Sequence, residues 1–579
     1  MAQDGLLSME QDGVVTRRGL LVRAGSTAAV AAAASVLSAG APAVALAAPA
    51  EQAANTLRLN TGSEPDTIDP QKASFVGEIE KIMMVFRNLM ALDKDGNPYP
   101  EMAAGMPEVT EDGTRLTFTL RDGLVFSDGT PLTASHFEYA WKRHLDPNVA
   151  GEYAFTGYII SGAEEYNTAD PKKLTPDQLQ ALRDAVGVKA LDDKTITFKL
   201  KAPAPYFLAI LGTWNGVPVR QELIMQGNGG NDSDSTWTEP ATYIGNGPYV
   251  LTLWEHQNRM HFKANPLYYR GAPPISDYDY AMISEPAVAF AAYLNDELDR
   301  TGVQVEDKRR VDSDPELSAQ FVQYPGTCTF YVGFNTQKAP FDNQKVRSAF
   351  SFALDRAGFV RDILGGQGIP ARQFVPPGFP GYYEFELEEQ TFNPTVAQRL
   401  LAEAGYPGGK GLPEIKLTYS ANARNKTRFE ALAAMYKQNL GIDMPLDPVE
   451  PRAYTALVKD PKTTPQLFFL GWCQDYPDPQ DWYSTVFHSK STVTHVGWKN
   501  PEFDRLVDAA DIEQDPGRRR ELYRQAAQIL INDAPVAFFY YSVVWALTKP
   551  RVKAPKAALM DPNATFFLEH YLYESSLAG

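Results

Sequence analysis

The stretch Gln466–Tyr483 reads QLFFLGWCQDYPDPQDWY, and its character changes abruptly at Cys473. It begins with an apolar run, Leu467–Leu470, as a buried strand would. The cysteine is followed by three aspartates and two prolines, set among Trp and Tyr. A carboxylate such as Asp475 is costly beside apolar surface unless a positive or hydrogen-bonding group meets it. The stretch therefore predicts a core strand that leads into a polar loop. The group that meets the Asp475 carboxylate must then come from another part of the protein or from a ligand.

The composition of the whole chain narrows the class of protein. At 579 residues the chain is too long for one core, and its size predicts about two to four domains. Hydrophobic residues make up 44% and charged residues 22%, which is typical of a soluble globular protein. The net charge of −17 disfavours a nucleic-acid partner, because phosphate would repel such a surface. The aromatic content of 11% fits a large core or an aromatic-lined ligand cavity, and both interpretations stay open.

The N-terminus predicts a cleavable export signal over residues 1–47 rather than part of the fold. Arg17, Arg18 and Arg23 precede a weakly hydrophobic Ala-rich run that ends in Ala-Leu-Ala at 45–47, a small-x-small cleavage pattern. The run is short, contains Gly and is followed by a cleavage site, which disfavours a retained membrane span. The paired arginines favour twin-arginine export, and an ordinary secretion signal is the alternative. No cysteine lies near the cleavage point, so we expect a periplasmic protein without a lipid anchor.

Export also affects whether the two cysteines, Cys328 and Cys473, can form a disulfide. The periplasm is oxidising, so two cysteines far apart in sequence can pair there. Two buried free thiols are the alternative.

Hydrophobic periodicity predicts mixed α/β structure throughout. Alternating strands are expected at 116–120 and 196–200, and a helix at 75–92. A second helix should begin at Pro394, where Asn393 can cap it, and end near Gly405. Further helices are expected from Pro501 and from Gly517, followed by a strand that starts near 536.

Signatures of catalysis or metal binding are missing from the sequence. G-x-S-x-G, H-E-x-x-H and P-loop patterns do not occur. Asp475, Asp478 and Asp481 could suggest calcium ligands, but the two prolines and the lack of a turn glycine do not fit a standard calcium loop. We therefore expect no catalytic residues, no metal and no cofactor.

Five separated segments resemble the periplasmic oligopeptide-binding proteins, the solute-binding components of peptide ABC importers (family 5, the peptide and nickel receptor class). They are FSDGTPLTASHFEYAWKRHLDPNVAGEYA (126–154), YIGNGPY (243–249), GTCTFYVGFNTQKAPFDNQKVRSAFSFALDR (326–356), NPTVAQRLLAEAGYPGG (393–409) and GWCQDYPDPQDWY (471–483). The resemblance implies an α/β fold of the periplasmic binding protein type II-like kind, with two lobes that close on a ligand about a hinge. Lobe I would comprise 48–86, 218–327 and 541–579, an extra domain 87–217 would pack on it, and lobe II would be 328–540. The resemblance also implies a disulfide between Cys328 and Cys473.

The same resemblance implies the ligand contacts. Asp475 would meet the α-ammonium of a bound peptide, Gly471 would leave backbone groups open to an extended ligand, and Trp472 would line a side-chain pocket. The other positions that would approach the ligand are Val76, Tyr153 and Tyr331. Phe469 and Asn425 stand where the enteric members of the family have basic residues, so carboxylate recognition and peptide length are less well specified.

The leading hypothesis is a monomeric, non-enzymatic receptor that delivers oligopeptides to permease subunits of an ABC transporter in the inner membrane. One alternative is a receptor of the same fold for another amine-bearing solute, such as a cell-wall peptide or an opine-like compound. Another, from a different class, is a secreted hydrolase with an unfamiliar motif.

Overall fold

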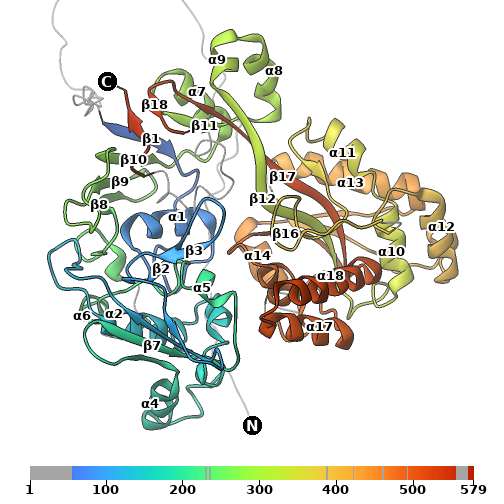
Figure 1. Cartoon of the computed structure of the whole chain (residues 1–579). Helices are drawn as coiled ribbons and strands as arrows, with labels where there is room; N and C mark the ends of the chain where they lie inside the picture. The colour runs from blue at the N-terminus through green and yellow to red at the C-terminus, as the bar shows by residue number, and fades with distance from the viewer. Residues whose placement is uncertain are drawn as a thin grey trace, which may run out of the picture. The chain divides into compact units, whose positions relative to one another are not determined.

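A computed structural model describes residues 55–227, 231–233, 236–386, 389–421, 423–459, 462–491, 493, 495–555 and 572–578 (Figure 1). The predicted export signal, 1–47, lies outside these described residues. The described residues all belong to one compact unit. None of their helices is both long and apolar enough to span a bilayer.

The largest sheet carries the strand predicted at the start of the quoted stretch. Its strand order is β11 (Arg300–Gly302), β17 (Val536–Thr548), β12 (Phe321–Phe334), β16 (Leu467–Cys473), β14 (Leu417–Ser420) and β15 (Leu446–Val449), and β13 (Ile369–Pro370) pairs with β17. β12 and β17 are the long strands that run side by side in Figure 1, and they are rich in the aromatic and β-branched residues that favour sheets. Their register shifts between Pro325 and Thr329, where a proline without an N–H and a glycine interrupt the ladder.

Two smaller four-stranded sheets are built from the first half of the chain. One has the order β1 (Thr56–Asn60), β10 (Asp277–Ala281), β9 (Arg259–Ala264) and β8 (Tyr249–Glu255). The other has the order β4 (Glu108–Val109), β5 (Arg115–Thr119), β7 (Thr195–Lys199) and β6 (Val188–Ala190), and it contains both predicted alternating strands. Two-stranded pairs are formed by β2 (Met90–Leu92) with β3 (Pro98–Pro100) and by β18 (Val552–Lys553) with β19 (Ser576–Leu577).

Helices accompany all of these sheets, which confirms the α/β class. In the first half of the chain they are α1 (Val76–Val85), α2 (Ala134–His144), η1 (Ala154–Gly157), α3 (Ala163–Asn167), α4 (Pro176–Ala185), α5 (Phe207–Ile210), α6 (Gln221–Met225), η2 (Thr236–Thr238) and α7 (Pro286–Leu294). In the second half they are α8 (Val305–Ser313), α9 (Pro315–Gln320), α10 (Gln344–Phe352), α11 (Arg356–Asp362), α12 (Pro394–Glu403), η3 (Pro407–Gly409), α13 (Ala423–Leu440), α14 (Pro451–Lys459), α15 (Pro479–Trp482), α16 (Ser484–Phe487), α17 (Pro501–Ile512) and α18 (Pro516–Asp533). The predicted start of α12 is confirmed, since Asn393 accepts the Val396 N–H.

The helix predicted over 75–92 is wrong in its second half. α1 ends at Val85, and 90–92 form strand β2 instead. The chain is turned out of the helix at Arg87, whose N–H and C=O both bond to the side chain of Asn246. Next to it, the Asn88 side chain donates to the carbonyl of Thr213. These partners are distant in sequence, so the apolar periodicity of 75–92 did not reveal them.

Buried apolar side chains gather in several clusters, and one of them includes residues from both halves of the chain. That cluster contains buried residues from Leu57 to Tyr280, and Tyr476 joins it from the loop after β16. Two other clusters lie on the large sheet and its helices. The predicted domain limits at 327/328 and 540/541 fall inside β12 and β17, and the division into lobes stays a prediction.

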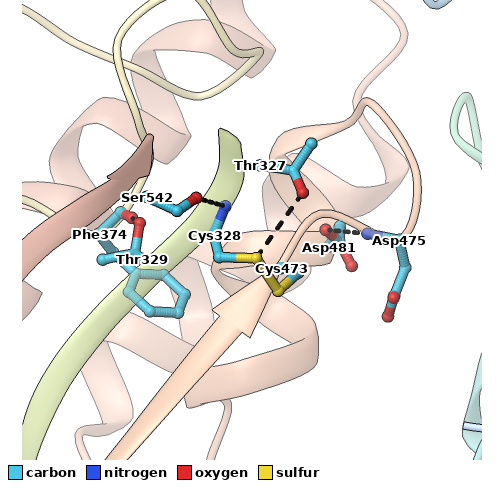
Figure 2. Close-up of a disulfide and its surroundings, with 8 residues drawn as sticks. All are labelled: Thr327, Cys328, Thr329, Phe374, Cys473, Asp475, Asp481 and Ser542. Atoms are coloured by element: carbon cyan, nitrogen blue, oxygen red, sulfur yellow. Dashed lines mark hydrogen bonds between the residues drawn. A yellow bond between two sulfur atoms is a disulfide. The ribbon is translucent and has the colours of Figure 1, made fainter. Parts of the chain in front are cut away.

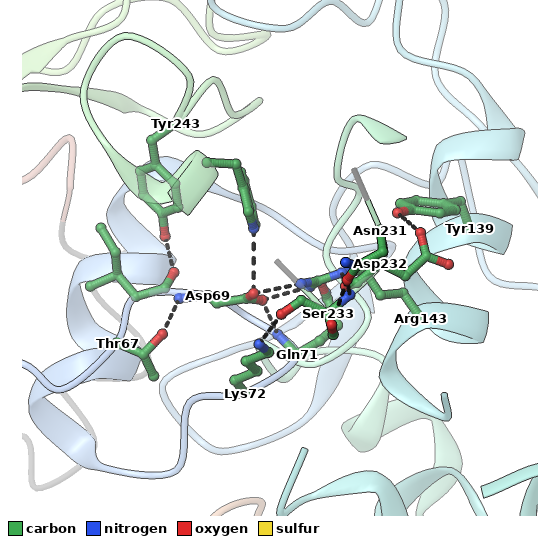
Figure 3. Close-up of polar contacts among 12 residues, drawn as sticks. Thr67, Asp69, Gln71, Lys72, Tyr139, Arg143, Asn231, Asp232, Ser233 and Tyr243 are labelled. Carbon is green, nitrogen blue, oxygen red and sulfur yellow. Dashed lines mark hydrogen bonds and ion pairs between the residues drawn. The ribbon is translucent and has the colours of Figure 1, made fainter. Parts of the chain in front are cut away.

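A buried ion pair ties the segment after β1 to α2 (Figure 3). Both oxygens of Asp69 accept from the guanidinium of Arg143 at 2.6 Å, and neither side chain is exposed. Gln71 accepts a further bond from the same guanidinium at 2.6 Å. Burial alone would raise the pKa of Asp69, but the charge and hydrogen bonds of Arg143 outweigh it and the pKa is lowered.

We expect Asp69→Asn to reduce the free energy of unfolding by about 3–5 kcal/mol near neutral pH, because the buried Arg143 loses its counter-ion and faces an amide NH2 that cannot accept from it. A carboxyl with a lowered pKa stabilises the fold above its unfolded value and loses that contribution as pH falls. Wild type should therefore lose more stability than the variant on acidification, as measured by denaturant unfolding at several pH values. Asp122→Asn, which removes the exposed partner of Lys194, is the control and should change little. Parallel acid profiles for Asp69→Asn and wild type would contradict the prediction.

Candidate functional site

The loop after β16 is anchored at its first residue. Cys328 and Cys473 lie opposite each other on β12 and β16 and form the expected disulfide (Figure 2). The next residue, Gln474, donates its N–H to the carbonyl of Thr327 at 3.1 Å. The N–H of Cys328 in turn bonds to Ser542 of β17 at 3.1 Å. These links fix the chain to the two long strands immediately before Asp475.

Two carboxylates come together in this loop. The N–H of Asp475 donates to Oδ2 of Asp481 at 3.1 Å (Figure 2). This bond closes the turn that leads into α15, the helix that contains Asp481. Asp478 caps that helix by accepting the Gln480 N–H at 2.8 Å. Asp481 is fully buried, whereas Asp475 keeps part of its surface open. Asp475 is therefore the carboxylate that a ligand can reach, and Asp481 lies behind it.

Tyr153 meets Asp475 from the first half of the chain. Its hydroxyl approaches the Asp475 carboxylate closely enough to influence the pKa of that carboxyl. The ring lies 5.0 Å from that of Trp214 and 5.4 Å from that of Phe155, which hold it just before η1. The structure thus brings together two of the predicted ligand-binding residues, Asp475 and Tyr153.

The electrostatics of this group favour a cationic ligand. Burial raises the pKa of Asp475, and the nearby Tyr153 hydroxyl offsets this only in part. The pKa of Asp481 is raised by burial and then by the Asp475 charge. Among the described residues, Lys, Arg and His side chains form no ion pair with either carboxylate. A buried carboxylate without a counter-ion is costly, so a ligand ammonium would be well stabilised here.

An open strand edge leads up to these carboxylates. β16 pairs with β12 along its length, but β14 pairs with it only at Leu467 and Phe468. The N–H and C=O of Phe469 both bond to the Tyr454 hydroxyl, at 3.1 and 2.6 Å, so they point away from β12. Backbone groups alternate along a strand, so those of Gly471 point the same way. No strand among the described residues pairs with Gly471 on that side.

The other predicted ligand contacts lie in different surroundings. Trp472 is half-buried and packs on a core cluster of the large sheet. Tyr331 is 3% exposed, with its ring 6.0 Å from that of Phe374. Val76 is the first residue of α1 and is 42% exposed. In the described part of the chain neither Tyr331 nor Val76 touches the Asp475 carboxylate, and their roles in binding stay predictions.

The two positions that differ from the enteric pattern carry no charge in this structure. Phe469 stacks on Phe330 at 5.8 Å and packs against Phe429 at 5.1 Å. The Asn425 side chain donates to the carbonyl of Ser420 at 2.8 Å. Neither position supplies a cation for a ligand carboxylate.

Sequence reasoning missed Asp481 as a member of the site. The residue stood in the quoted stretch, and it was considered there only as a calcium ligand. Its neighbour Asp478 is engaged elsewhere, in a bidentate pair with Arg519 at 2.7 and 2.8 Å. Across the described residues, His, Cys, Asp and Glu side chains form no group of three or more that could hold a metal.

Comparisons with known proteins find a matching family model, and relatives and solved structures that resemble this chain. Residues 97–493 match the family model of bacterial extracellular solute-binding proteins, family 5. The periplasmic oligopeptide-binding protein OppA of Salmonella typhimurium is 32% identical over 504 residues, which cover 86% of this chain and 89% of that protein. The Escherichia coli murein tripeptide-binding protein MppA has a TM-score of 0.75 at 28% identity, over 86% of this chain and 94% of that one. Haemophilus influenzae OppA in complex with RPPGFSPFR has a TM-score of 0.76 at 25% identity, over 91% and 99%. These structural matches confirm the predicted binding-protein fold.

Proposed function

Because the chain belongs to family 5 of the bacterial extracellular solute-binding proteins, we propose that it captures oligopeptides and delivers them to the permease subunits of an ABC transporter. The observation that carries this proposal is the pair of neighbouring carboxylates, the partly exposed Asp475 and the buried Asp481, at the end of an open strand edge. An extended peptide would place its α-ammonium at Asp475 and pair its backbone with Gly471, as an added strand does. The family is one of binding proteins, and the proposed role needs no catalysis.

The proposed role also predicts the compartment in which the protein acts and its monomeric state. The relative in Salmonella typhimurium is named a periplasmic protein, and we place this chain in the same compartment after removal of residues 1–47. The paired arginines at 17 and 18 favour twin-arginine export, and the protein would act as a free monomer without a lipid anchor. Lobe closure would bring Tyr153 of the extra domain against Asp475 of lobe II, and the approach of the Tyr153 hydroxyl to Asp475 is consistent with this.

A second candidate ligand is another amine-bearing solute, such as a cell-wall peptide. The uncharged Phe469 and Asn425 favour this possibility, because neither provides a cation for the carboxylate end of an ordinary peptide. The similarity to a murein tripeptide-binding protein is consistent with it. Recognition of the amino end by Asp475 is common to both candidates.

Native mass spectrometry of the protein purified from cells discriminates between these candidates. We expect a series of bound masses that resolve, after denaturation, into peptides of mixed sequence. One defined compound would favour the second candidate. Turnover of a peptide mixture by the purified protein on prolonged incubation would contradict both and indicate a hydrolase.

A further inference from the structure

Asp481 is an unusual neighbour for a ligand-binding carboxylate. Its side chain is fully buried, and its Oδ2 accepts the Asp475 N–H. Its Oδ1 has no hydrogen-bond partner among the described residues. The indole N–H of Trp472 approaches the carboxyl without reaching hydrogen-bond geometry. A buried acceptor left in this way is costly, and the cost is much greater if the carboxyl is ionised.

The other titratable groups around the pair do not supply a compensating charge. Tyr153 approaches from the segment before η1 and is neutral, with the acid Glu152 beside it in sequence. Asp478, at the start of α15, adds a further negative charge near Asp481. Arg519 of α18 is the nearby cation, and both arms of its guanidinium are committed to Asp478. The Tyr476 hydroxyl bonds to Gln480 and Thr485 rather than to either carboxylate.

Two adjacent carboxylates in such surroundings do not both ionise readily, because each charge opposes the other. We propose that Asp481 is a positioning residue whose charge opposes ionisation of Asp475, so that binding of the ligand's ammonium displaces a proton from the pair of carboxyls. The empty site holds one proton between Asp475 and Asp481, and the arriving ammonium replaces it. The O–H bond of the carboxylic acid breaks and its proton passes to water, while the ligand keeps all three N–H bonds of its ammonium. This inference rests on the proposed role of Asp475 in ligand binding.

The exchange predicts how affinity depends on pH. Both carboxyl groups have a raised pKa without ligand, and a bound cation favours their ionised form. Affinity should therefore increase as pH rises through the range where the empty pair loses its proton, and level off above it. The slope should approach about tenfold per pH unit at its steepest, as release of one proton requires.

Calorimetry with one free-amino peptide, repeated at the same mildly acidic pH in buffers of different ionisation enthalpy, counts the protons released on binding. We expect close to one for wild type. Asp481→Asn can still accept the Asp475 N–H but removes the competing charge, so its proton release should be smaller than that of wild type and its affinity should depend less on pH. Burial of Asp475 accounts for the release that remains. Asp511→Asn is the matched control. Asp511 is a half-buried aspartate with a raised pKa, of about 7, but Ser484 and Tyr523 bond to it, and among the described residues no hydrogen bond joins it to Asp475.

Each outcome is decisive. Binding of the peptide without proton release by wild type overturns the exchange and leaves the proposed function standing. Equal release by wild type and Asp481→Asn overturns the role of Asp481. Failure of wild type to bind any free-amino peptide overturns the proposed function and this inference with it. If Asp481→Asn does not fold, the same calorimetry is repeated on wild type with an N-acetylated peptide. If binding of that peptide releases as many protons as binding of the free-amino peptide, the exchange is overturned.

Discussion

Asp475→Ala is expected to weaken binding of a free-amino peptide by roughly 30- to 3000-fold. The change leaves the ligand's ammonium enclosed without its counter-ion, and truncation of one partner of a buried charged pair costs about 2–5 kcal/mol. Each 1.4 kcal/mol corresponds to about a factor of ten in affinity. Asp475→Asn should have a smaller effect where the amide oxygen can still accept from the ammonium. Isothermal titration calorimetry with a single peptide of known sequence measures both variants.

The assignment is tested from the ligand side by N-acetylation of the same peptide. Acetylation removes the positive charge that Asp475 is proposed to bind, so it deletes the same interaction as Asp475→Ala. The two changes should therefore be strongly non-additive in a double-mutant cycle. Tyr153→Phe, which removes only the hydroxyl that approaches Asp475, is a useful control and should leave the effect of acetylation large. If acetylation weakens binding equally in wild type and in Asp475→Ala, Asp475 does not bind the amino end.

Local features of this fold could be predicted from the sequence because their causes are local. The strand at Leu467–Leu470 follows from an apolar run, and the start of α12 follows from an Asn followed by Pro. The helix expected over 75–92 failed because Asn246, far away in sequence, holds the backbone of Arg87 in a non-helical course. The periodicity of apolar residues indicates which residues prefer burial, but it does not reveal a distant side chain that hydrogen-bonds to the backbone.

The candidate site could be predicted from the sequence only in part, because its contacts also join residues that no local pattern links. The cost of burying Asp475 was evident from its apolar neighbours, but its partners were not. The family resemblance implied only that Tyr153 approaches the ligand, and its approach to Asp475 was not predicted, because these residues lie on distant segments. The bond to Asp481 depends on how a turn with two prolines closes, and six-residue spacing predicts no regular contact. The pairing of Asp478 with Arg519 likewise had no signal in spacing, since α18 reaches the loop only in the folded chain.

Loss of the disulfide between Cys328 and Cys473 should be the largest single change in stability, because the loop that it closes spans 145 residues. In the chain-entropy model a loop of this length corresponds to about 4–5 kcal/mol. We expect reduction, or Cys328→Ser combined with Cys473→Ser, to lower Tm in a thermal scan. Peptide affinity should also fall, because the disulfide and the Gln474 N–H together fix the chain just before Asp475. Reductant should leave the double serine variant unchanged, which separates the disulfide from general effects of the reagent. Alkylation of denatured, unreduced protein that labels two thiols would show that the bond does not form in the purified protein. An unchanged Tm after complete reduction would instead show that the native loop is held by the β12–β16 ladder and not by the disulfide.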